Sequence, residues 1–332
     1  MSHVIDSHRR SLLKAGLATA TGITLGVPFA VMAADWPDRP ITYTVPFAPG
    51  GATDIIGRIY GVSAAKFLGQ SIVVENIGGT GGSLGSAKVA RAKPDGYNIV
   101  GGTISSHAIN VSIYPDIGYD PIKSFKPIIL TGSLPNVLVV KADSPYKSVQ
   151  DVINAGKKSD SQLNFGSSGV GSSQHLTGEL FMDVTGTKML HVTYKGSSPS
   201  LQALMSGEID LLFDNITSAL PLIQSGRLRA LGVTSKTPSA ALPDIAPLDK
   251  LGLPGFEVVS WQASFAPAGT PDDIIQKLYA AMSQTLQQPE VRKQLEGLGL
   301  EVSGAGPEEL ARFQQAEVKK WADVAKKANI KL

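Results

Sequence analysis

A short β-branched run, a glycine-rich turn and an amphipathic stretch follow one another repeatedly along this chain. The first such unit is "ITYTV" (41–45), then the loop "PFAPGGATD" (46–54) and a helix-like segment. "SIVVEN" (71–76) leads in the same way into "IGGTGGSLG" (77–85), and "YNIVGG" (97–102) leads into a loop, "TISSHAIN". Short strands that alternate with helices predict βαβ units and a mostly parallel sheet.

A second series of these units lies between two apolar, extended segments. The segments are "LPNVLVVKAD" (134–143) and "EVVSWQASFAPAG" (257–269), and both contain or adjoin proline. We interpret them as crossovers between two α/β lobes, the second inserted into the first. With 332 residues, the chain is long enough for two domains of common size. The predicted bounds are 34–138 and 256–332 for lobe 1, which includes the C-terminal helices, and 139–255 for lobe 2.

Residues 1–33 have the pattern of an export signal. Arg9 and Arg10 precede a weakly apolar run that ends in small residues, and cleavage is expected near Ala33. The arginine pair resembles a twin-arginine signal. The competing interpretation is a single membrane anchor, which the glycines, threonines and proline in the run disfavour. The expected location of the mature protein is the periplasm.

Charge and cysteine content exclude several functions. The chain has a formal net charge of +2, and the charged residues of segment 1–33 account for it, so the mature protein is neutral. A neutral chain without a basic run argues against nucleic-acid binding. The chain has no cysteine, which excludes disulfides, zinc–thiolate sites and a cysteine nucleophile.

Four glycine- and serine-rich loops are candidate anion sites. "FAPGGATD" and "GGTGGS" belong to lobe 1, and "SSGVGSSQH" and "YKGSS" belong to lobe 2. In open α/β sheets ligands lie beyond the carboxyl ends of the strands, where helix N-termini present unpaired N–H groups. For any single loop, an ordinary turn is the favoured interpretation. Four such loops, two in each lobe, favour one shared cleft.

Two motifs associated with other chemistry can be tested against the sequence. "GGSLG" matches the G-x-S-x-G pattern of serine hydrolases around Ser83, with Asp95 or Asp120 and His175 or His191 available as partners, but it lies in a glycine-rich run where the pattern arises easily. A dinucleotide-binding fingerprint fails because Leu84 occupies the position of the third glycine.

The histidines and acidic residues of the mature chain give weaker indications of a function. His107, His175 and His191 lack metal-ligand spacing, and His191 is better interpreted as structural. Asp54 suits the first turn of a helix. Asp214 and Asn215 either meet a ligand amine or hydroxyl or stabilise the hinge, and the sequence does not favour one of these roles.

Several segments together resemble one family. They are "WPDRPITYTVPFAPGGATDIIGR", "VVENIGGTGGSLG", "NFGSSGVGSSQHLTGELF", "HVTYKGSSPSLQALMSGEIDLLFDN" and "WQASFAPAGTP". In this order they resemble the Bug family, the extracytoplasmic solute receptors of tripartite tricarboxylate transporters. The resemblance covers the whole mature chain. It implies a type II periplasmic-binding-protein fold, two α/β lobes joined by a hinge.

The resemblance also implies a set of ligand-binding residues around a carboxylate. From lobe 1 these are Phe47, Ala48, Gly51, Thr53, Asp54, Gly79, Thr80, Gly81, Gly82, Ser105, Ser106 and His107. From lobe 2 they are Ser167, Ser168, Ser172, His175, Tyr194 and Asp214. The family's usual alanine between the glycines is Thr80 here, which adds a hydroxyl to the carboxylate site.

The expected function is binding without catalysis. The resemblance implies a monomeric receptor that needs no cofactor or metal, binds a dicarboxylate, tricarboxylate, acidic amino acid or aromatic acid, and delivers it to a large and a small permease subunit. The alternatives are an exported serine hydrolase that uses Ser83 and a receptor that signals to a sensor kinase.

Overall fold

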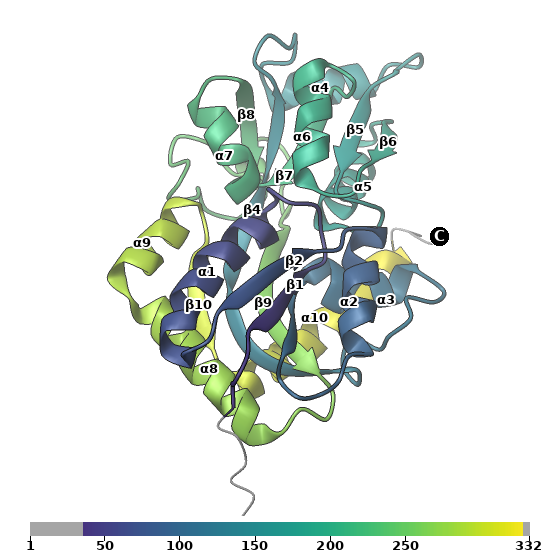
Figure 1. Ribbon diagram of the computed structural model, residues 1–332. Coiled ribbons are helices and arrows are strands. Elements are labelled where there is room, and N and C mark those ends of the chain that lie inside the picture. The colour runs from purple at the N-terminus through teal and green to yellow at the C-terminus, as the bar shows by residue number, and fades with distance from the viewer. Residues whose placement is uncertain (1–35, 328–332) are drawn as a thin grey trace, which may run out of the picture. The chain divides into compact units, whose positions relative to one another are not determined.

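The computed structural model describes residues 36–327, and the predicted export signal therefore lies outside the described residues (Figure 1). The strands are β1 (Ile41–Val45), β2 (Ile72–Asn76), β3 (Asn98–Thr103), β4 (Phe125–Lys141), β5 (Asn164–Ser167), β6 (Leu190–Thr193), β7 (Leu211–Asn215), β8 (Leu228–Val233), β9 (Val259–Pro267) and β10 (Glu301–Ala305). The α-helices are α1 (Ala52–Leu68), α2 (Ser83–Ala90), α3 (Asn110–Ile113), α4 (Val149–Gly156), α5 (Ser173–Thr185), α6 (Ser197–Ser206), α7 (Ile216–Gln224), α8 (Asp272–Gln287), α9 (Pro289–Gly297) and α10 (Pro307–Lys327). Three short helical turns complete the set: η1 (Thr80–Gly82), η2 (Ser105–Ile109) and η3 (Leu248–Lys250).

Each lobe contains a small parallel sheet. In lobe 1, β1 pairs in parallel with β2 and β3. In lobe 2, β5 pairs in parallel with β6 and β7. The carboxyl ends of these strands carry the loops that the sequence singles out, and the helices α1, α2, α5 and α6 start there. This arrangement directs helix N-termini toward the region between the two sheets.

The strand β4 joins the two sheets. Its first part, Phe125 to Pro135, pairs with β9, and its last part, from Asn136 onward, pairs with β7 along one edge and β8 along the other. All of these pairings are antiparallel, as are β3 with β9 and β10 with β4. The prediction of a mostly parallel sheet therefore describes the outer strands only, because the crossover strands run against them.

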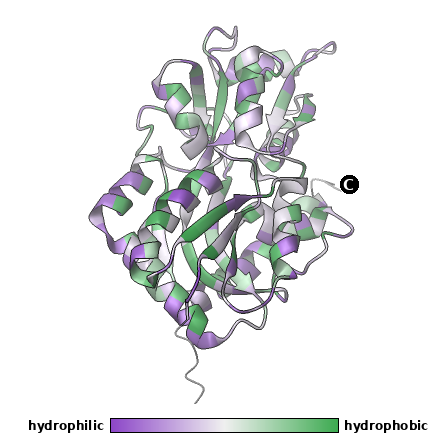
Figure 2. Cartoon of the chain, in the orientation of Figure 1, coloured by the Kyte–Doolittle hydropathy of each residue, from purple (hydrophilic) through white to green (hydrophobic). Residues whose placement is uncertain are grey.

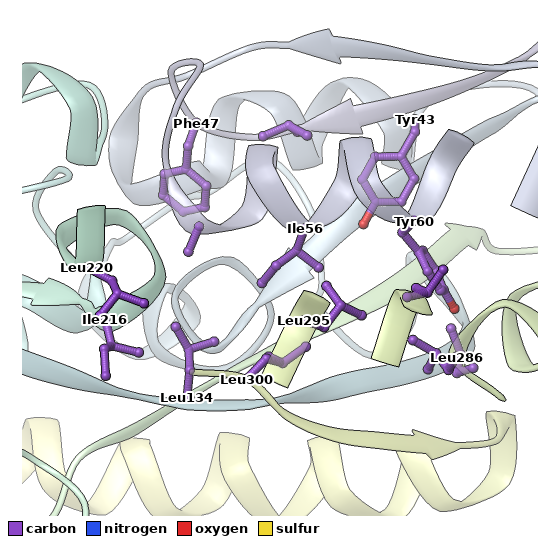
Figure 3. Close-up of a cluster of buried hydrophobic side chains, with 14 of the residues drawn as sticks. Tyr43, Phe47, Ile56, Tyr60, Leu134, Ile216, Leu220, Leu286, Leu295 and Leu300 are labelled. Carbon is purple, nitrogen blue, oxygen red and sulfur yellow. The ribbon is translucent and has the colours of Figure 1, made fainter. Parts of the chain in front are cut away.

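Apolar side chains fill the space between sheets and helices. Figure 2 shows hydrophobic residues along the strands, whereas the helices carry hydrophobic and hydrophilic residues on different faces. One buried cluster is drawn in Figure 3, where Ile56 and Tyr60 of α1, Leu134 of β4 and Ile216 of α7 lie around a shared core. Because α7 belongs to lobe 2 and α1 to lobe 1, this core continues past the hinge.

The structure differs locally from the sequence expectations at one place. The segment expected as a loop, "TISSHAIN", forms the π-helical turn η2 and the start of α3. At the start of α8, the Thr270 hydroxyl donates to the Pro267 carbonyl at 2.8 Å, and Pro271 is the N-cap residue. Between residues 36 and 327, no helix combines the length and apolarity needed to cross a membrane.

Candidate functional site

A small cavity lies where the two lobes meet. Its volume is about 20 Å³, which is room for about one water molecule. Any larger ligand therefore enters only when the lobes move apart. The wall consists of Phe47, Gly51, Ala52, Thr53, Thr103 and Ser105 from lobe 1, Ser168, Ser173, Gln174, Ser197 and Asn215 from lobe 2, and Ser260 and Gln262 from β9.

The N-terminus of α1 forms the lobe 1 side of the cavity. Its N-cap, Gly51, has no side chain to accept the first N–H groups, and Ala52 and Thr53 line the cavity directly after it. The helix is 17 residues long, so its first turn carries a partial positive charge. The arrangement suits an anion such as a carboxylate, which would accept hydrogen bonds from the free backbone N–H groups.

Asp54 holds the loop before α1 in place from behind the cavity wall. The side chain is 4% exposed and accepts hydrogen bonds from the Gly50 N–H at 2.9 Å, the Asn76 amide at 2.9 Å and the Arg58 guanidinium at 3.0 Å. Burial alone would raise the pKa of this carboxyl, but these hydrogen bonds outweigh burial and lower the pKa. Asp54 therefore remains ionised and organises the loop, and it does not line the cavity.

The second glycine loop of lobe 1 contacts lobe 2 directly. A Cβ atom at Gly81 would collide with the Val170 carbonyl oxygen, and one at Gly169 would lie 2.9 Å from the Gly81 nitrogen. A Cβ at Gly82 would lie 2.9 Å from the Phe47 ring. Only glycine permits this approach of the two backbones, since Gly81 and Gly82 also have positive φ angles of 56° and 92°.

Three hydrogen bonds connect the lobes around the cavity. The Ala48 N–H donates to the Lys195 carbonyl at 3.1 Å, and the Ser173 N–H donates to the Ser105 hydroxyl at 3.0 Å. The Tyr114 hydroxyl donates to the Val170 carbonyl at 2.9 Å. These bonds form only when the lobes are together, so they stabilise the closed arrangement.

Asp214 lies behind the lobe 2 wall and is fully buried. Its Oδ1 atom accepts hydrogen bonds from the Ser197 hydroxyl at 2.6 Å and from the Gln174 amide at 3.2 Å. Burial raises the pKa of the Asp214 carboxyl to about 6, although both hydrogen bonds act to lower it. The carboxyl is therefore ionised at neutral pH and touches the cavity only through Ser197 and Gln174.

The three described histidines lie outside the cavity wall. His107 is 0% exposed, stacks on Phe265 with 4.2 Å between ring centroids, and shares a 2.9 Å hydrogen bond with the Ser106 hydroxyl through Nδ1. Burial lowers the pKa of His107 to about 3. His175 stacks on His191 at 4.2 Å.

His191 has a structural partner, as the sequence indicated. Its Nε2 lies 2.6 Å from the hydroxyl of Ser167. Burial and, secondarily, His175 lower the pKa of His191 to about 4.

The predicted site residues divide into two groups. Phe47, Gly51, Thr53, Ser105 and Ser168 lie on the cavity wall. The others lie behind the wall or beside it, where they support loops or connect the lobes: Ala48, Asp54, Gly79, Thr80, Gly81, Gly82, Ser106, His107, Ser167, Ser172, His175, Tyr194 and Asp214. Tyr194, for example, donates its hydroxyl to Glu208 at 2.9 Å, and Ser172 caps α5 by accepting from the His175 N–H at 3.2 Å.

Sequence reasoning did not select several wall residues. Ser173, Gln174 and Ser197 occupy the first turns of α5 and α6, within the two lobe 2 loops predicted as anion sites, but they were not among the predicted ligand-binding residues. Gln262 is a buried polar residue within the apolar strand β9, which is itself a signal of function. Thr103 and Ser260 complete this group, and Asn215, for which the sequence left a ligand contact and a hinge role open, also lies on the wall.

Comparison with known sequences identifies a matching family and several relatives. The model of the family described as "Tripartite tricarboxylate transporter family receptor" matches residues 56–330. A protein of Pseudomonas sp. (strain P51), described as the UPF0065 protein in the tcbD-tcbE intergenic region, is 39% identical over 289 residues, 86% of this chain and 85% of that protein. The protein BugT of Bordetella pertussis (strain Tohama I) is 33% identical over 310 residues, 93% of this chain and 95% of that protein.

Solved structures show the same similarity. The periplasmic binding protein BugD has a TM-score of 0.86 and 35% identity, with 90% of this chain and 100% of that chain covered. The R. palustris protein Rpa4515 with adipate has a TM-score of 0.87 and 36% identity, with 90% and 100% covered. MatC from Rhodopseudomonas palustris with bound malate has a TM-score of 0.83 and 35% identity, with 87% and 99% covered. This likeness confirms the predicted fold class, the two-lobed fold of periplasmic binding proteins.

Proposed function

This chain belongs to the family of tripartite tricarboxylate transporter receptors, as its resemblance to the Bug family predicted, and we propose that it binds a small carboxylate between its two lobes and delivers it to a membrane permease. Family members are periplasmic solute-binding receptors. Delivery to a large and a small permease subunit, a monomeric state and export through a cleaved signal at 1–33 are parts of the proposal. So are the lobe bounds 34–138, 139–255 and 256–332.

The observation that carries the proposal is the uncapped N-terminus of α1 at the wall of the interlobe cavity. Its free N–H groups suit a carboxylate, and relatives of similar length are solved with adipate and with malate. Phe47, Gly51, Thr53 and Ser105 would contact the ligand from lobe 1, and Ser168 would contact it from lobe 2. The other predicted residues would hold the glycine loops and the closed lobes in position.

The proposal also includes the absence of catalysis. The Ser83 hydroxyl accepts a hydrogen bond from the Asn110 amide at 2.8 Å. Among residues 36–327, the histidine side chains have other hydrogen-bond partners and none is bonded to Ser83. A serine without a base to take its proton is not an activated nucleophile.

A thermal-shift screen of the mature protein tests the proposal. The panel contains monocarboxylates, dicarboxylates, tricarboxylates, acidic amino acids and aromatic acids, and calorimetry follows each hit. A true ligand at about 100 times its Kd adds about 2.7 kcal/mol to the free energy of unfolding, which raises the Tm by several degrees. A folded, ligand-free protein that responds to no carboxylate in the panel would refute the proposal.

Two glycine variants test whether binding requires the lobes to close. Gly81→Ala introduces a Cβ that meets the Val170 carbonyl across the lobes, so we expect ligand affinity to fall at least about tenfold. Gly69→Ala is the matched control, because Gly69 also has a positive φ, of 69°, but a Cβ there meets nothing within 4 Å. Equal affinities for the two variants would count against closure.

A further inference from the structure

The buried carboxylate of Asp214 determines the direction of the hydrogen bonds on the lobe 2 wall. An ionised carboxylate accepts hydrogen bonds and donates none. The single hydroxyl proton of Ser197 therefore points to Asp214 Oδ1, at 2.6 Å. The Gln174 amide nitrogen lies 3.2 Å from the same oxygen and 3.4 Å from Ser197 Oγ, and because these two acceptors are neighbours one N–H is shared between them.

The direction of the Ser197 hydrogen bond determines where the neighbouring hydroxyl protons point. Ser168 and Ser197 lie 3.2 Å apart, and since the Ser197 proton is committed, Ser168 must donate to Ser197. The Ser173 hydroxyl donates to the Gln174 carbonyl oxygen at 3.3 Å. Ser197 Oγ thus accepts from Ser168 and Gln174, whereas the side chains of Ser168 and Ser173 turn their protons away from the cavity and present lone pairs to it.

The lobe 1 side has the opposite character. It presents the N–H groups at the start of α1, beside Ala52 and Thr53. The Ser105 hydroxyl accepts from the Ser173 N–H at 3.0 Å and keeps its own proton for the cavity. Donors on the lobe 1 wall therefore face the acceptor side chains of Ser168 and Ser173 on the lobe 2 wall.

We propose, resting on the proposed function, that this site selects a carboxylate that also carries a hydroxyl or ammonium group, and that Asp214 is the positioning residue that sets this preference. The carboxylate lies at α1, and the hydroxyl or ammonium donates to Ser168, whose own proton is held by Ser197. An unsubstituted chain leaves the buried Ser168 acceptor without a partner. Sites built to bond a hydroxyl strongly reject analogues that lack it.

A purely structural role for Asp214 makes a different prediction. Gln174 lies in the first turn of α5 and Ser197 begins α6, so the same hydrogen bonds connect the two helices. If this connection were the whole role, loss of the carboxylate would lower stability and weaken all ligands alike. The ratio of affinities for substituted and unsubstituted ligands separates the two roles.

The experiment measures Kd by calorimetry at about pH 7.5, well above the range in which Asp214 titrates, for matched ligands of two chain lengths. The sets are succinate with malate and aspartate, and adipate with 2-hydroxyadipate and 2-aminoadipate. In the unmodified protein, we expect the best substituted ligand to bind at least about tenfold more tightly than its unsubstituted partner.

Three variants assign the preference to residues. Asp214→Val removes the acceptor of the Ser197 proton, so Ser197 can donate to Ser168 and the Ser168 proton turns to the cavity, and Ser197→Ala removes the acceptor of the Ser168 proton. Both should reduce the preference to within about twofold. Asp214→Asn retains an oxygen that accepts from Ser197 and should retain the preference to within about threefold. Ser197→Ala keeps the test decisive if Asp214→Val does not fold.

The outcomes distinguish this inference from the proposed function. An unsubstituted ligand that binds as tightly as its substituted partner overturns the inference alone. So does a preference that survives both Asp214→Val and Ser197→Ala, or one that Asp214→Asn abolishes as completely as Asp214→Val. If no member of either set binds and the wider carboxylate panel is also flat, the proposed function fails and the inference fails with it.

Discussion

Acidification should destabilise this protein through His107. The ring lies in an aromatic cluster with Phe265 and Phe125 and is 0% exposed, and burial lowers its pKa from 6.5 to about 3. In the unfolded chain the imidazole takes up a proton below its ordinary pKa, whereas in the folded chain it stays neutral until the pH nears 3. The stability due to His107 is therefore complete above pH 6.5 and is lost as the pH falls toward 3.

The size of this loss of stability follows from the difference between the pKa of His107 in the unfolded chain and in the folded chain. At about pH 4.5, about two pH units below the unfolded value, linkage gives a loss of about 3 kcal/mol relative to neutral pH. Urea unfolding at about pH 7.5 and about pH 4.5 measures it, in the unmodified protein and in His107→Phe. His191 also has a lowered pKa, of about 4, and contributes in the same direction, but it is present in both proteins and cancels in the comparison.

Ser106→Ala is the matched control for His107→Phe. It removes the hydroxyl that shares a 2.9 Å hydrogen bond with His107 Nδ1 and leaves the titrating ring in place. We expect Ser106→Ala to lower stability at both pH values and to retain the acid-dependent loss. His107→Phe should lose about 3 kcal/mol less than the unmodified protein and should bind ligand with an affinity within about threefold of it. An equal acid-dependent loss in both proteins would refute the reasoning.

Three further substitutions test single contacts. Tyr114→Phe removes the 2.9 Å hydrogen bond to the Val170 carbonyl, which connects the lobes away from the cavity wall. We expect calorimetry to show ligand binding about threefold to tenfold weaker. Unchanged affinity would show that this bond does not stabilise closure. Asp54→Asn removes the ion pair with Arg58. We expect urea unfolding to show a free energy of unfolding lower by about 1 to 3 kcal/mol, and carboxylate binding to weaken. A variant of unchanged stability would contradict the role of Asp54 in holding the loop. Ser83→Ala should leave ligand affinity within about twofold, and hydrolysis of a chromogenic ester that depends on Ser83 would contradict the absence of catalysis.

The sequence predicts the glycine loops well because their signals are local. Proline and glycine before a helix, as in "PFAPGGATD", determine the backbone over a few residues without reference to the rest of the fold. The two apolar crossover segments are long enough for their extended character to be evident, and both are strands, β4 and β9.

Side-chain direction is harder to predict. The family resemblance implies a ligand-binding role for His107, whereas its segment forms a π-helical turn in which the ring stacks on Phe265 of β9. Phe265 is more than 150 residues away, and no local pattern encodes that contact. The Asp214 network is similar, since it depends on how α5, α6 and β7 pack together.

The 17-residue strand β4 has a consequence for the order in which the chain folds. Its lobe 1 partner, β9, is separated from it in sequence by every strand of the inserted lobe, β5 to β8. The parallel strands β5, β6 and β7 are close in sequence and can associate early, whereas the β4–β9 pairing closes a long loop and is slow to form. We expect lobe 1 to remain an incomplete sheet, with the edges of β3 and β4 open, until lobe 2 is present and β9 is inserted between them.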